Sequence, residues 1–252
     1  MTAPALYVCV RPQQNAAEAE YESFRQAMRL EPDRLDRIDL VREPLPPDAG
    51  ERWRAFVVGG SPFNVSDPES TKTDVQKRLE ADLERIAGWA ASAGAHVSAF
   101  FTCYGIGIVT RLLGGEVTRA YPEDTGPVTV SLTAEGRRDP LFGGLAERFT
   151  GLTAHKEGTG RLPAGAVLLA TSQTCPVQAY RVGDRLWATQ FHPEPTAKAF
   201  TERMAVYRDD GYFASDDFEA ISGRVLAASV TEPVRSLRAF ARRVLVDQPP
   251  AA

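Results

Sequence analysis

The sequence predicts an α/β fold in which helices cover both faces of a mostly parallel sheet. Short apolar runs rich in β-branched and aromatic residues alternate with segments of helical periodicity as far as Gly115. Beyond that point, short strand-like runs separated by Gly, Pro and Asp predict a mixed β extension, and helical segments follow. With 252 residues, 43% of them hydrophobic, the chain is long enough to form one large domain with a substantial core.

The first half of the chain supplies the alternating strands and helices of the parallel sheet. Strands are expected at residues 6–10, 37–41, 55–58 and 97–102, and helices at residues 18–29, 73–93 and 106–113. Apolar residues recur at helical spacing throughout 73–93 until Gly94 stops the pattern. The turn between the strand at 97–102 and the next helix is expected at the carboxyl edge of the sheet, where open α/β folds bind ligands.

The second half is expected to hold short strands first and helices last. The strands are expected at residues 128–132, 148–153, 167–170, 177–181 and 186–190, and the helices at 197–208, 217–228 and 231–246. Thr231 is a suitable N-cap for the last helix, and Pro233 suits its first turn because amide groups there have no partner within the helix. This order predicts a β extension beside the parallel sheet and surface helices after it.

Composition and charge argue against several classes of protein. The net charge of −4 argues against a nucleic-acid partner, and no apolar run approaches the roughly 20 residues of a membrane span. Met1-Thr2-Ala3-Pro4 leads into the first expected strand without a basic region and a signal core. We therefore expect a cytoplasmic protein without a membrane partner.

The three cysteines, Cys9, Cys103 and Cys175, are odd in number and widely spaced, which argues against a disulfide framework or a structural zinc site. No metal site is expected. Cys9 lies in the first expected strand and Cys175 precedes a proline, so both are expected to be inert, buried hydrophobic residues.

Cys103 lies in the segment Phe101-Thr102-Cys103-Tyr104-Gly105, at the expected turn from strand to helix. A thiol is strongly nucleophilic only as a thiolate, and a helix N-terminus together with a nearby imidazole favours that form. Gly105 permits a tight turn, and the Tyr104 N–H would point to where an oxyanion forms. A structural cysteine that merely begins a helix fits this segment equally well, so both interpretations stay open on this segment alone.

The segment His192-Pro193-Glu194, followed by Pro195, favours the catalytic interpretation. Proline disfavours the α conformation in the residue before it, so both prolines hold their neighbours in extended chain. Residues i and i+2 of an extended chain point to the same side, so the Glu194 carboxylate can hold one ring nitrogen of His192. The other ring nitrogen is then free to act on a thiol. A strand-ending turn with a structural histidine is the alternative interpretation.

Three segments together resemble the markers of the class I (triad) glutamine amidotransferase family, especially the glutaminase domain of GMP synthase. They are Val58-Gly59-Gly60-Ser61-Pro62, Cys103-Tyr104-Gly105 and Phe191-His192-Pro193-Glu194, in the order and spacing of that family. Segments at 113–117, 155–157 and 162–165 also resemble it, so the resemblance runs from about residue 5 to residue 195. It implies a flavodoxin-like fold, with an amidotransferase-like domain over residues 1–195 and a helical extension over 196–252 packed on the same domain.

The resemblance also implies a mechanism. Cys103 would attack the side-chain amide of glutamine to form a γ-glutamyl thioester, His192 would act as general acid and base, and Glu194 would orient His192. Backbone N–H groups of Gly60 and Tyr104 would form the oxyanion hole. Further substrate contacts would come from Gly59, Ser61 and His155, although a structural hydrogen bond explains His155 equally well. No cofactor is expected.

Two residues depart from the family pattern. Phe101 stands where the family usually has a glycine, and it needs room where strand and helix approach closely. Gly107 stands where the family usually has a glutamine that helps to form the substrate pocket. The second departure bears on the identity of the substrate more than on the chemistry of Cys103, so another γ-glutamyl compound stays open as the substrate.

The fate of the ammonia separates three functions. The residues after Glu194 are too few for an ATP-using synthetase domain, so an ammonia-accepting synthetase would be a separate chain. The second function is that of a free-standing γ-glutamyl peptidase or hydrolase. The third is that of a catalytically weak regulatory or binding protein that keeps the pocket. Release of glutamate from glutamine, from γ-glutamyl peptides or from neither would distinguish them.

Overall fold

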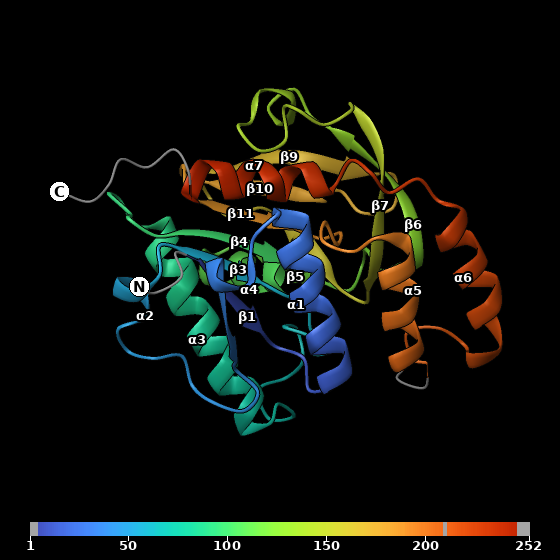
Figure 1. Ribbon diagram of the computed structural model, residues 1–252, viewed down its shortest axis with the longest axis horizontal. Helices are drawn as coiled ribbons and strands as arrows, with labels where there is room; N and C mark the ends of the chain where they lie inside the picture. The colour runs from blue at the N-terminus through green and yellow to red at the C-terminus, as the bar shows by residue number, and fades with distance from the viewer. Residues whose placement is uncertain (1–4, 209–210, 246–252) are drawn as a thin grey trace.

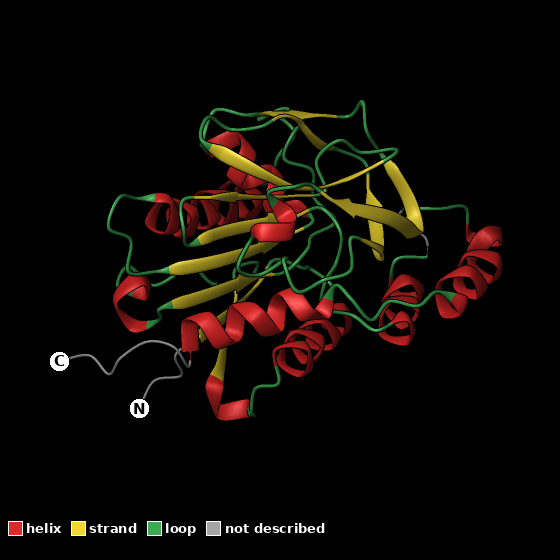
Figure 2. Ribbon diagram, turned by 90° about the horizontal axis from the view of Figure 1, so that it is seen from above, coloured by secondary structure: helices red, strands yellow, loops and turns green. Residues whose placement is uncertain are grey.

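A nine-stranded sheet runs through the molecule, with helices on both of its faces (Figures 1 and 2). The computed structural model describes residues 5–208 and 211–245. The strands are β1 (Ala5–Cys9), β2 (Leu35–Asp39), β3 (Ala55–Val58), β4 (Ser98–Thr102), β5 (Glu116–Thr118), β6 (Glu123–Leu132), β7 (Arg148–His155), β8 (Gly158–Arg161), β9 (Ala166–Ser172), β10 (Ala179–Val182) and β11 (Leu186–Thr189). The α-helices are α1 (Gln14–Met28), α2 (Ala49–Arg52), α3 (Asp74–Ala91), α4 (Tyr104–Leu112), α5 (Ala197–Val206), α6 (Phe218–Ala227) and α7 (Val234–Leu245).

The large sheet has a parallel half and an antiparallel half. Its order is β2-β1-β3-β4-β11-β10-β9-β6-β7, and the first five strands pair in parallel. The last four strands pair antiparallel and form the β extension. These findings confirm the predicted α/β fold. They also place β11 beside β4, so the segments that follow these two strands meet at one edge of the sheet.

Two hydrophobic clusters fix the helices to opposite faces of the sheet. Leu79 and Leu83 of α3 pack with Val109 of α4 on one face. Phe24 of α1 and Phe240 of α7 pack on the other face, together with the central strands. The Thr73 hydroxyl accepts a hydrogen bond from the Gln76 N–H and begins α3, because it satisfies an amide that has no partner within the helix.

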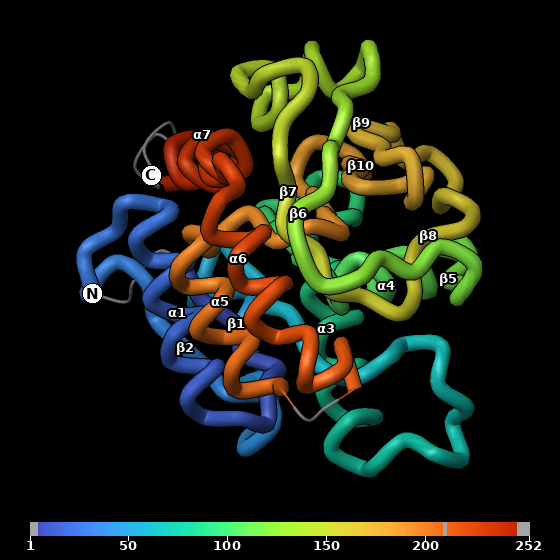
Figure 3. The backbone as a smooth tube through the Cα atoms, turned by 90° about the vertical axis from the view of Figure 1, so that its right-hand side faces the viewer, coloured from blue at the N-terminus to red at the C-terminus, as the bar shows by residue number. Residues whose placement is uncertain are grey.

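Helices α5 and α6 form a third cluster beside the antiparallel half. Phe200 and Met204 of α5 pack with Ile221 of α6 against Leu152 of β7. Helix α5 lies between α1 and α6 and contacts both (Figures 1 and 3). The segment after His192 therefore packs against the first helix of the chain. The division into a domain of residues 1–195 and an extension of residues 196–252 stays a prediction.

The structure differs from the predicted elements at several points. Helix α7 begins at Val234, so Thr231 does not cap it and Pro233 precedes its first turn. Residue 246, the predicted last residue of this helix, lies outside the described residues. Helix α1 begins four residues earlier than predicted, and the pairing of β5 with β8 was not predicted. No helix in the described part of the chain is long and apolar enough to cross a membrane.

Candidate active site

Cys103 occupies a strained turn between β4 and α4. Its φ of 50° and ψ of −105° lie in a region that residues other than glycine rarely adopt. The Cys103 N–H donates to the Thr189 carbonyl at 2.8 Å, which ties the turn to the end of β11. The Cys103 thiol therefore lies at the N-terminus of α4, as a nucleophile elbow requires.

Phe101 fits into this turn because Gly105 leaves room for it. The Phe101 side chain is fully buried, and a Cβ atom built on Gly105 would lie 2.9 Å from Phe101 Cδ1. A larger residue at position 105 would therefore collide with the Phe101 ring. Strand β4 and helix α4 still approach closely, because Gly105 has no side chain in the space that the Phe101 ring occupies.

His192 and Glu194 meet as the extended chain predicts. His192 Nδ1 lies 3.0 Å from Glu194 Oε1, and both side chains are buried. The His192 N–H donates to the Leu152 carbonyl at 2.9 Å, which anchors the segment to β7. A Cβ atom on Gly60 would lie 2.8 Å from His192 Cε1 and 3.5 Å from Cys103 Cβ, so the three residues converge. This leaves His192 Nε2 for the Cys103 thiol.

The charges around His192 stabilise its protonated form. Burial is the largest influence and lowers the pKa of His192, but the Glu194 carboxylate and Cys103 together outweigh it, and the pKa rises to about 9. Arg203 opposes this rise and Cys103 adds to it. Burial raises the pKa of Glu194, yet His192 and Arg203 outweigh burial and lower it to about 2. The pair thus favours an imidazolium beside a carboxylate, a state that can stabilise a thiolate.

A buried ionic cluster that the sequence did not predict supports this pair. Arg203 of α5 donates through Nη1 to Glu194 Oε1 at 2.8 Å and to Glu20 Oε1 at 3.0 Å. Arg11 donates to the same Glu20 oxygen through Nε at 2.9 Å and Nη2 at 2.7 Å. Glu20, His192 and Glu194 could by distance hold a metal ion, but the two guanidinium groups already engage the carboxylates and would repel a cation.

The Gly60 N–H lies on this cluster and is not free for an oxyanion. It donates to Glu20 Oε1 at 3.2 Å, which differs from the expectation that it helps to form the oxyanion hole. The Ser61 N–H is the next amide along the chain, and it has no acceptor among the residues that the structure describes. Gly59 is needed for close packing, because a Cβ atom there would lie 2.0 Å from Glu20 Oε2.

His155 lies near Cys103 but has no free ring nitrogen. His155 Nε2 lies 2.9 Å from Glu123 Oε2, and His155 Nδ1 lies 2.8 Å from the Glu157 carbonyl oxygen. The structure therefore favours the structural interpretation of His155. Beside it, the Glu157 carboxylate accepts from the Val65 N–H at 2.6 Å and the Ser66 N–H at 3.0 Å.

Gly107 opens the surface of α4 next to Cys103. A Cβ atom at this position would lie 3.0 Å from Val65 Cγ2 and 3.6 Å from Glu157 Oε1. Val65 and Glu157 therefore take part of the space that a longer side chain at position 107 would need. The space beside Gly107 is thus partly filled by Val65 and Glu157.

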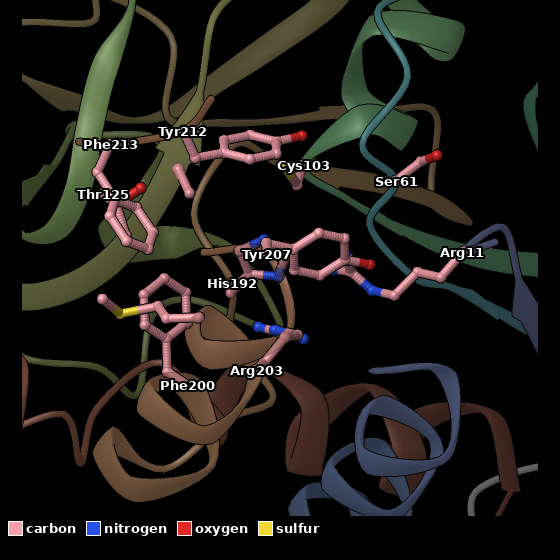
Figure 4. A pocket seen from close by; sticks show the side chains of 12 residues that line it. Arg11, Ser61, Cys103, Thr125, His192, Phe200, Arg203, Tyr207, Tyr212 and Phe213 are labelled. Carbon is pink, nitrogen blue, oxygen red and sulfur yellow. The ribbon is translucent and has the colours of Figure 1, made fainter. Parts of the chain in front are cut away.

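Two cavities meet at Cys103 and share Ser61, Ala154 and Tyr212. The first cavity contains His192, and its wall includes the aromatic side chains of Phe200, Tyr207, Tyr212 and Phe213 (Figure 4). The second cavity lies along the first turn of α4 and is bounded by Gly107, Glu157 and Gln190 among others. Cys103 therefore lines a cavity on each of two sides, only one of which contains His192.

The chain belongs to the class I glutamine amidotransferase family, since residues 68–207 match the description "Glutamine amidotransferase class-I". Its sequence is similar to the GMP synthase [glutamine-hydrolyzing] of Thermotoga petrophila, with 34% identity over 125 residues, which are 50% of this chain and 24% of that protein. The chain thus aligns with about a quarter of the length of that relative. A second relative, Gamma-glutamyl peptidase 3 of Arabidopsis thaliana, is 26% identical over 57% of this chain and 55% of the relative.

A solved structure with a similar fold is a glutamine amidotransferase from Thermotoga maritima. The TM-score is 0.74 at 18% sequence identity, covering 97% of this chain and 98% of that chain. At this identity the similarity concerns the fold alone, and it agrees with the flavodoxin-like arrangement that the sequence resemblance implied.

Proposed function

We propose that the chain hydrolyses the side-chain amide of a γ-glutamyl compound through a thioester on Cys103. The observation that carries this proposal is the buried His192–Glu194 pair, held beside a cysteine at a strained strand-to-helix turn. A nucleophile, a base and a residue that orients the base are the components of amide hydrolysis by a cysteine enzyme. Membership of the amidotransferase family supports the same chemistry.

In the proposed reaction, the Cys103 thiolate attacks the amide carbon and the carbonyl oxygen becomes an oxyanion. The Tyr104 N–H, at the start of α4, and the Ser61 N–H are the proposed donors to this oxyanion. Each such donor is typically worth about 3 kcal/mol of barrier. His192 gives its proton to the departing nitrogen, the C–N bond breaks and a γ-glutamyl thioester remains. Water, deprotonated by His192, then attacks the thioester, releases glutamate and restores the thiolate.

Glutamine is the first candidate substrate. The cavity along α4 does not include His192, so it suits the γ-glutamyl part, while the departing nitrogen faces His192 on the other side. The relatives named as GMP synthase [glutamine-hydrolyzing] favour glutamine. The ammonia would then pass to a synthetase on a separate chain. Three unpaired cysteines suit the reducing conditions of the cytoplasm, where we propose the reaction takes place.

A γ-glutamyl peptide is the second candidate, favoured by the aromatic walls beside His192. Phe200, Tyr207, Tyr212 and Phe213 offer far more apolar contact than a departing ammonia molecule could use. An apolar amino acid as leaving group would bury surface there and be protonated by His192. The similarity to Gamma-glutamyl peptidase 3 supports this candidate.

Glutamate release from L-glutamine and from γ-glutamylphenylalanine tests both candidates. The purified chain is compared with Cys103→Ser and with Cys175→Ser as the control for a buried thiol. Release from either compound that vanishes only in Cys103→Ser supports the proposed chemistry, and the preferred compound identifies the leaving group. Release that persists in Cys103→Ser, or no release from either compound, contradicts the proposal.

A further inference from the structure

Glu20 is a fully buried carboxylate that lies outside the Cys103, His192 and Glu194 set. It belongs to α1, a helix that precedes the residues matched by the family. Its Oε1 atom accepts from Arg11, Arg203 and the Gly60 N–H, and its Oε2 atom accepts from the Tyr7 hydroxyl at 2.8 Å. A charged group buried this deeply is costly unless it is well paired, and three of the four partners of Glu20 belong to the site, namely Arg11, Arg203 and Gly60.

One set of contacts runs from Glu20 to the base. Arg203 Nη1 bridges Glu20 Oε1 and Glu194 Oε1, at 3.0 and 2.8 Å. The same Glu194 oxygen holds His192 Nδ1 at 3.0 Å. Because one guanidinium nitrogen is shared by two carboxylates, the charge on Glu20 limits how strongly Arg203 draws Glu194 away from His192. Figure 4 shows Arg203 rising from α5 below His192.

The other set of contacts runs from Glu20 to the turn beside the nucleophile. Glu20 Oε1 accepts from the Gly60 N–H at 3.2 Å, and the Gly59 backbone lies directly against Oε2. Holding the Gly59–Gly60 peptide restrains the start of the next peptide, which carries the Ser61 N–H. The position of Glu20 therefore affects the proposed oxyanion donor as well as the base.

We propose that Glu20 is a positioning residue that holds Glu194, through Arg203, and the Gly59–Gly60 turn in register with Cys103. This inference rests on the proposed function for its kinetic effect, but the geometry can be tested without a substrate. Contacts across 183 residues of sequence, from Glu20 to Arg203, make helices α1 and α5 part of the active site. Structural support alone would not require the network to reach both the His192–Glu194 pair and the turn beside Cys103.

The titration of His192 reports on the network, and the chain has only three histidines. Seven ionisable groups face His192 or its partners: Tyr7, Arg11, Glu20, Cys103, Glu194, Arg203 and Tyr207. With ¹³C-labelled histidine, nuclear magnetic resonance should give His192 a midpoint of about 9 in the unaltered protein. His96 is exposed and His155 is held by a separate carboxylate, so both serve as internal references.

Glu20→Gln should lower the His192 midpoint by about one pH unit. The loss of a negative charge leaves Arg203 to bind Glu194 alone, which weakens the hold of Glu194 on His192. Arg203→Met should move the midpoint the other way, because Arg203 lowers the pKa of His192. Glu22→Gln is the matched control on the same helix, because Glu22 is exposed and pairs only with neighbours on α1. The two opposite shifts distinguish positioning from a general loss of stability.

Kinetics complete the test if the chain hydrolyses a γ-glutamyl compound. Glu20→Gln should lower kcat about tenfold and leave KM within about twofold, because Glu20 does not line either cavity. A folded Glu20→Gln protein with the midpoint and kcat of Glu22→Gln would overturn the inference. Where Glu20→Gln does not fold, the double variant with Arg203→Met removes one charge of each sign. Because Glu20 acts through Arg203, the His192 midpoint of this double variant should equal that of Arg203→Met, and a midpoint clearly below it would overturn the inference. An absence of hydrolysis in every variant would count against the proposed function alone.

Discussion

The described residues include two buried histidine–glutamate pairs, each with a cysteine nearby, and the pairs differ first in the partner of the second ring nitrogen. His192 contacts Glu194 at 3.0 Å next to Cys103, and His155 contacts Glu123 at 2.9 Å in the region of Cys175. The second ring nitrogen of His155 is taken by a carbonyl oxygen, whereas that of His192 is left for a thiol. A buried histidine–carboxylate pair therefore does not by itself indicate a catalytic base. The partner of the second ring nitrogen determines whether the imidazole is free to act on a thiol.

The two carboxylates, Glu123 and Glu194, also differ in the groups that they contact. Glu123 accepts hydrogen bonds from Ser172, Thr174 and Gln178, so it joins β6 to the β9–β10 region. Glu194 instead shares Arg203 with Glu20. The Glu123 network holds the antiparallel half of the sheet together, and the Glu194 network joins two helices to the proposed nucleophile.

The largest expected difference between the pairs is catalytic. His192→Gln should lower kcat by at least about a thousandfold, because the general acid and base is lost. His155→Gln should change kcat by less than about tenfold and should instead lower the free energy of unfolding. Steady-state kinetics and urea unfolding of both variants give the comparison. An equally large loss of kcat in folded His155→Gln would mean that the second pair takes part in the chemistry.

The next difference concerns stability in acid. Burial raises the pKa of Glu123, but the hydrogen bond from His155 and the two hydroxyl groups outweigh it and lower the pKa to about 2. A carboxyl group whose pKa is lowered in the folded state stabilises that state at pH values above its unfolded pKa, near 4.5. This stabilisation is lost as the pH falls toward the folded pKa of about 2. Glu123→Gln should remove about 2 kcal/mol at neutral pH. Urea unfolding at pH 7 and pH 4 measures the free energy of unfolding of the variant and of the parent. A variant as stable as the parent at pH 7 would contradict a stabilising role for the Glu123 network.

The His192 pair should show the opposite dependence on pH. Its raised folded pKa means that the stabilisation is fully present below the unfolded value of 6.5 and is lost as the pH rises through about 9. The expected loss is on the order of 2 kcal/mol, and it should be absent from His192→Gln. Unfolding free energies between pH 6 and pH 9.5 test this. An identical pH dependence in both proteins would contradict the assignment of the charge to His192.

The smallest effects are expected at the second cysteine. Burial raises the pKa of Cys175 to about 12 and that of Cys9 to about 11, so neither thiol should react with iodoacetamide at neutral pH. Cys175→Ser should leave kcat within about twofold of the parent. Peptide mass spectrometry after brief alkylation should find the label on Cys103. Label on Cys175 in the folded protein would remove the distinction between the two regions.

Local sequence patterns predicted the fold and the elements that carry the site. The apolar repeat of 73–93 and the capping residue Thr73 define α3, and the segments around Cys103 and His192 lie at turns where the extended and helical patterns meet. Short strands were harder to predict, because the three residues of β5 do not establish an alternation. The last helix begins at Val234, directly after Pro233. Its first turn is formed by the Arg235 and Ser236 N–H groups, which donate to the Glu232 and Pro233 carbonyl groups.

The ionic cluster could not be predicted because its members are far apart in the sequence. Arg11, Glu20 and Arg203 lie in segments with no common motif, and each would ordinarily be assigned to a solvated surface. Glu20 does lie on the face of α1 that also carries the buried residues Ala16, Phe24 and Ala27. A charged residue at a buried position of an amphipathic helix was therefore the one available signal, although it does not identify the partner.

The most direct test of the proposed chemistry is to trap the γ-glutamyl thioester. The chain is mixed with the γ-glutamyl compound that it hydrolyses, quenched in acid, digested and examined by mass spectrometry. We expect a γ-glutamyl adduct on the peptide that contains Cys103, formed as fast as glutamate first appears and lacking in Cys103→Ser. Turnover without an adduct on Cys103, or an adduct on Cys9 or Cys175, would contradict the role of Cys103 as the nucleophile.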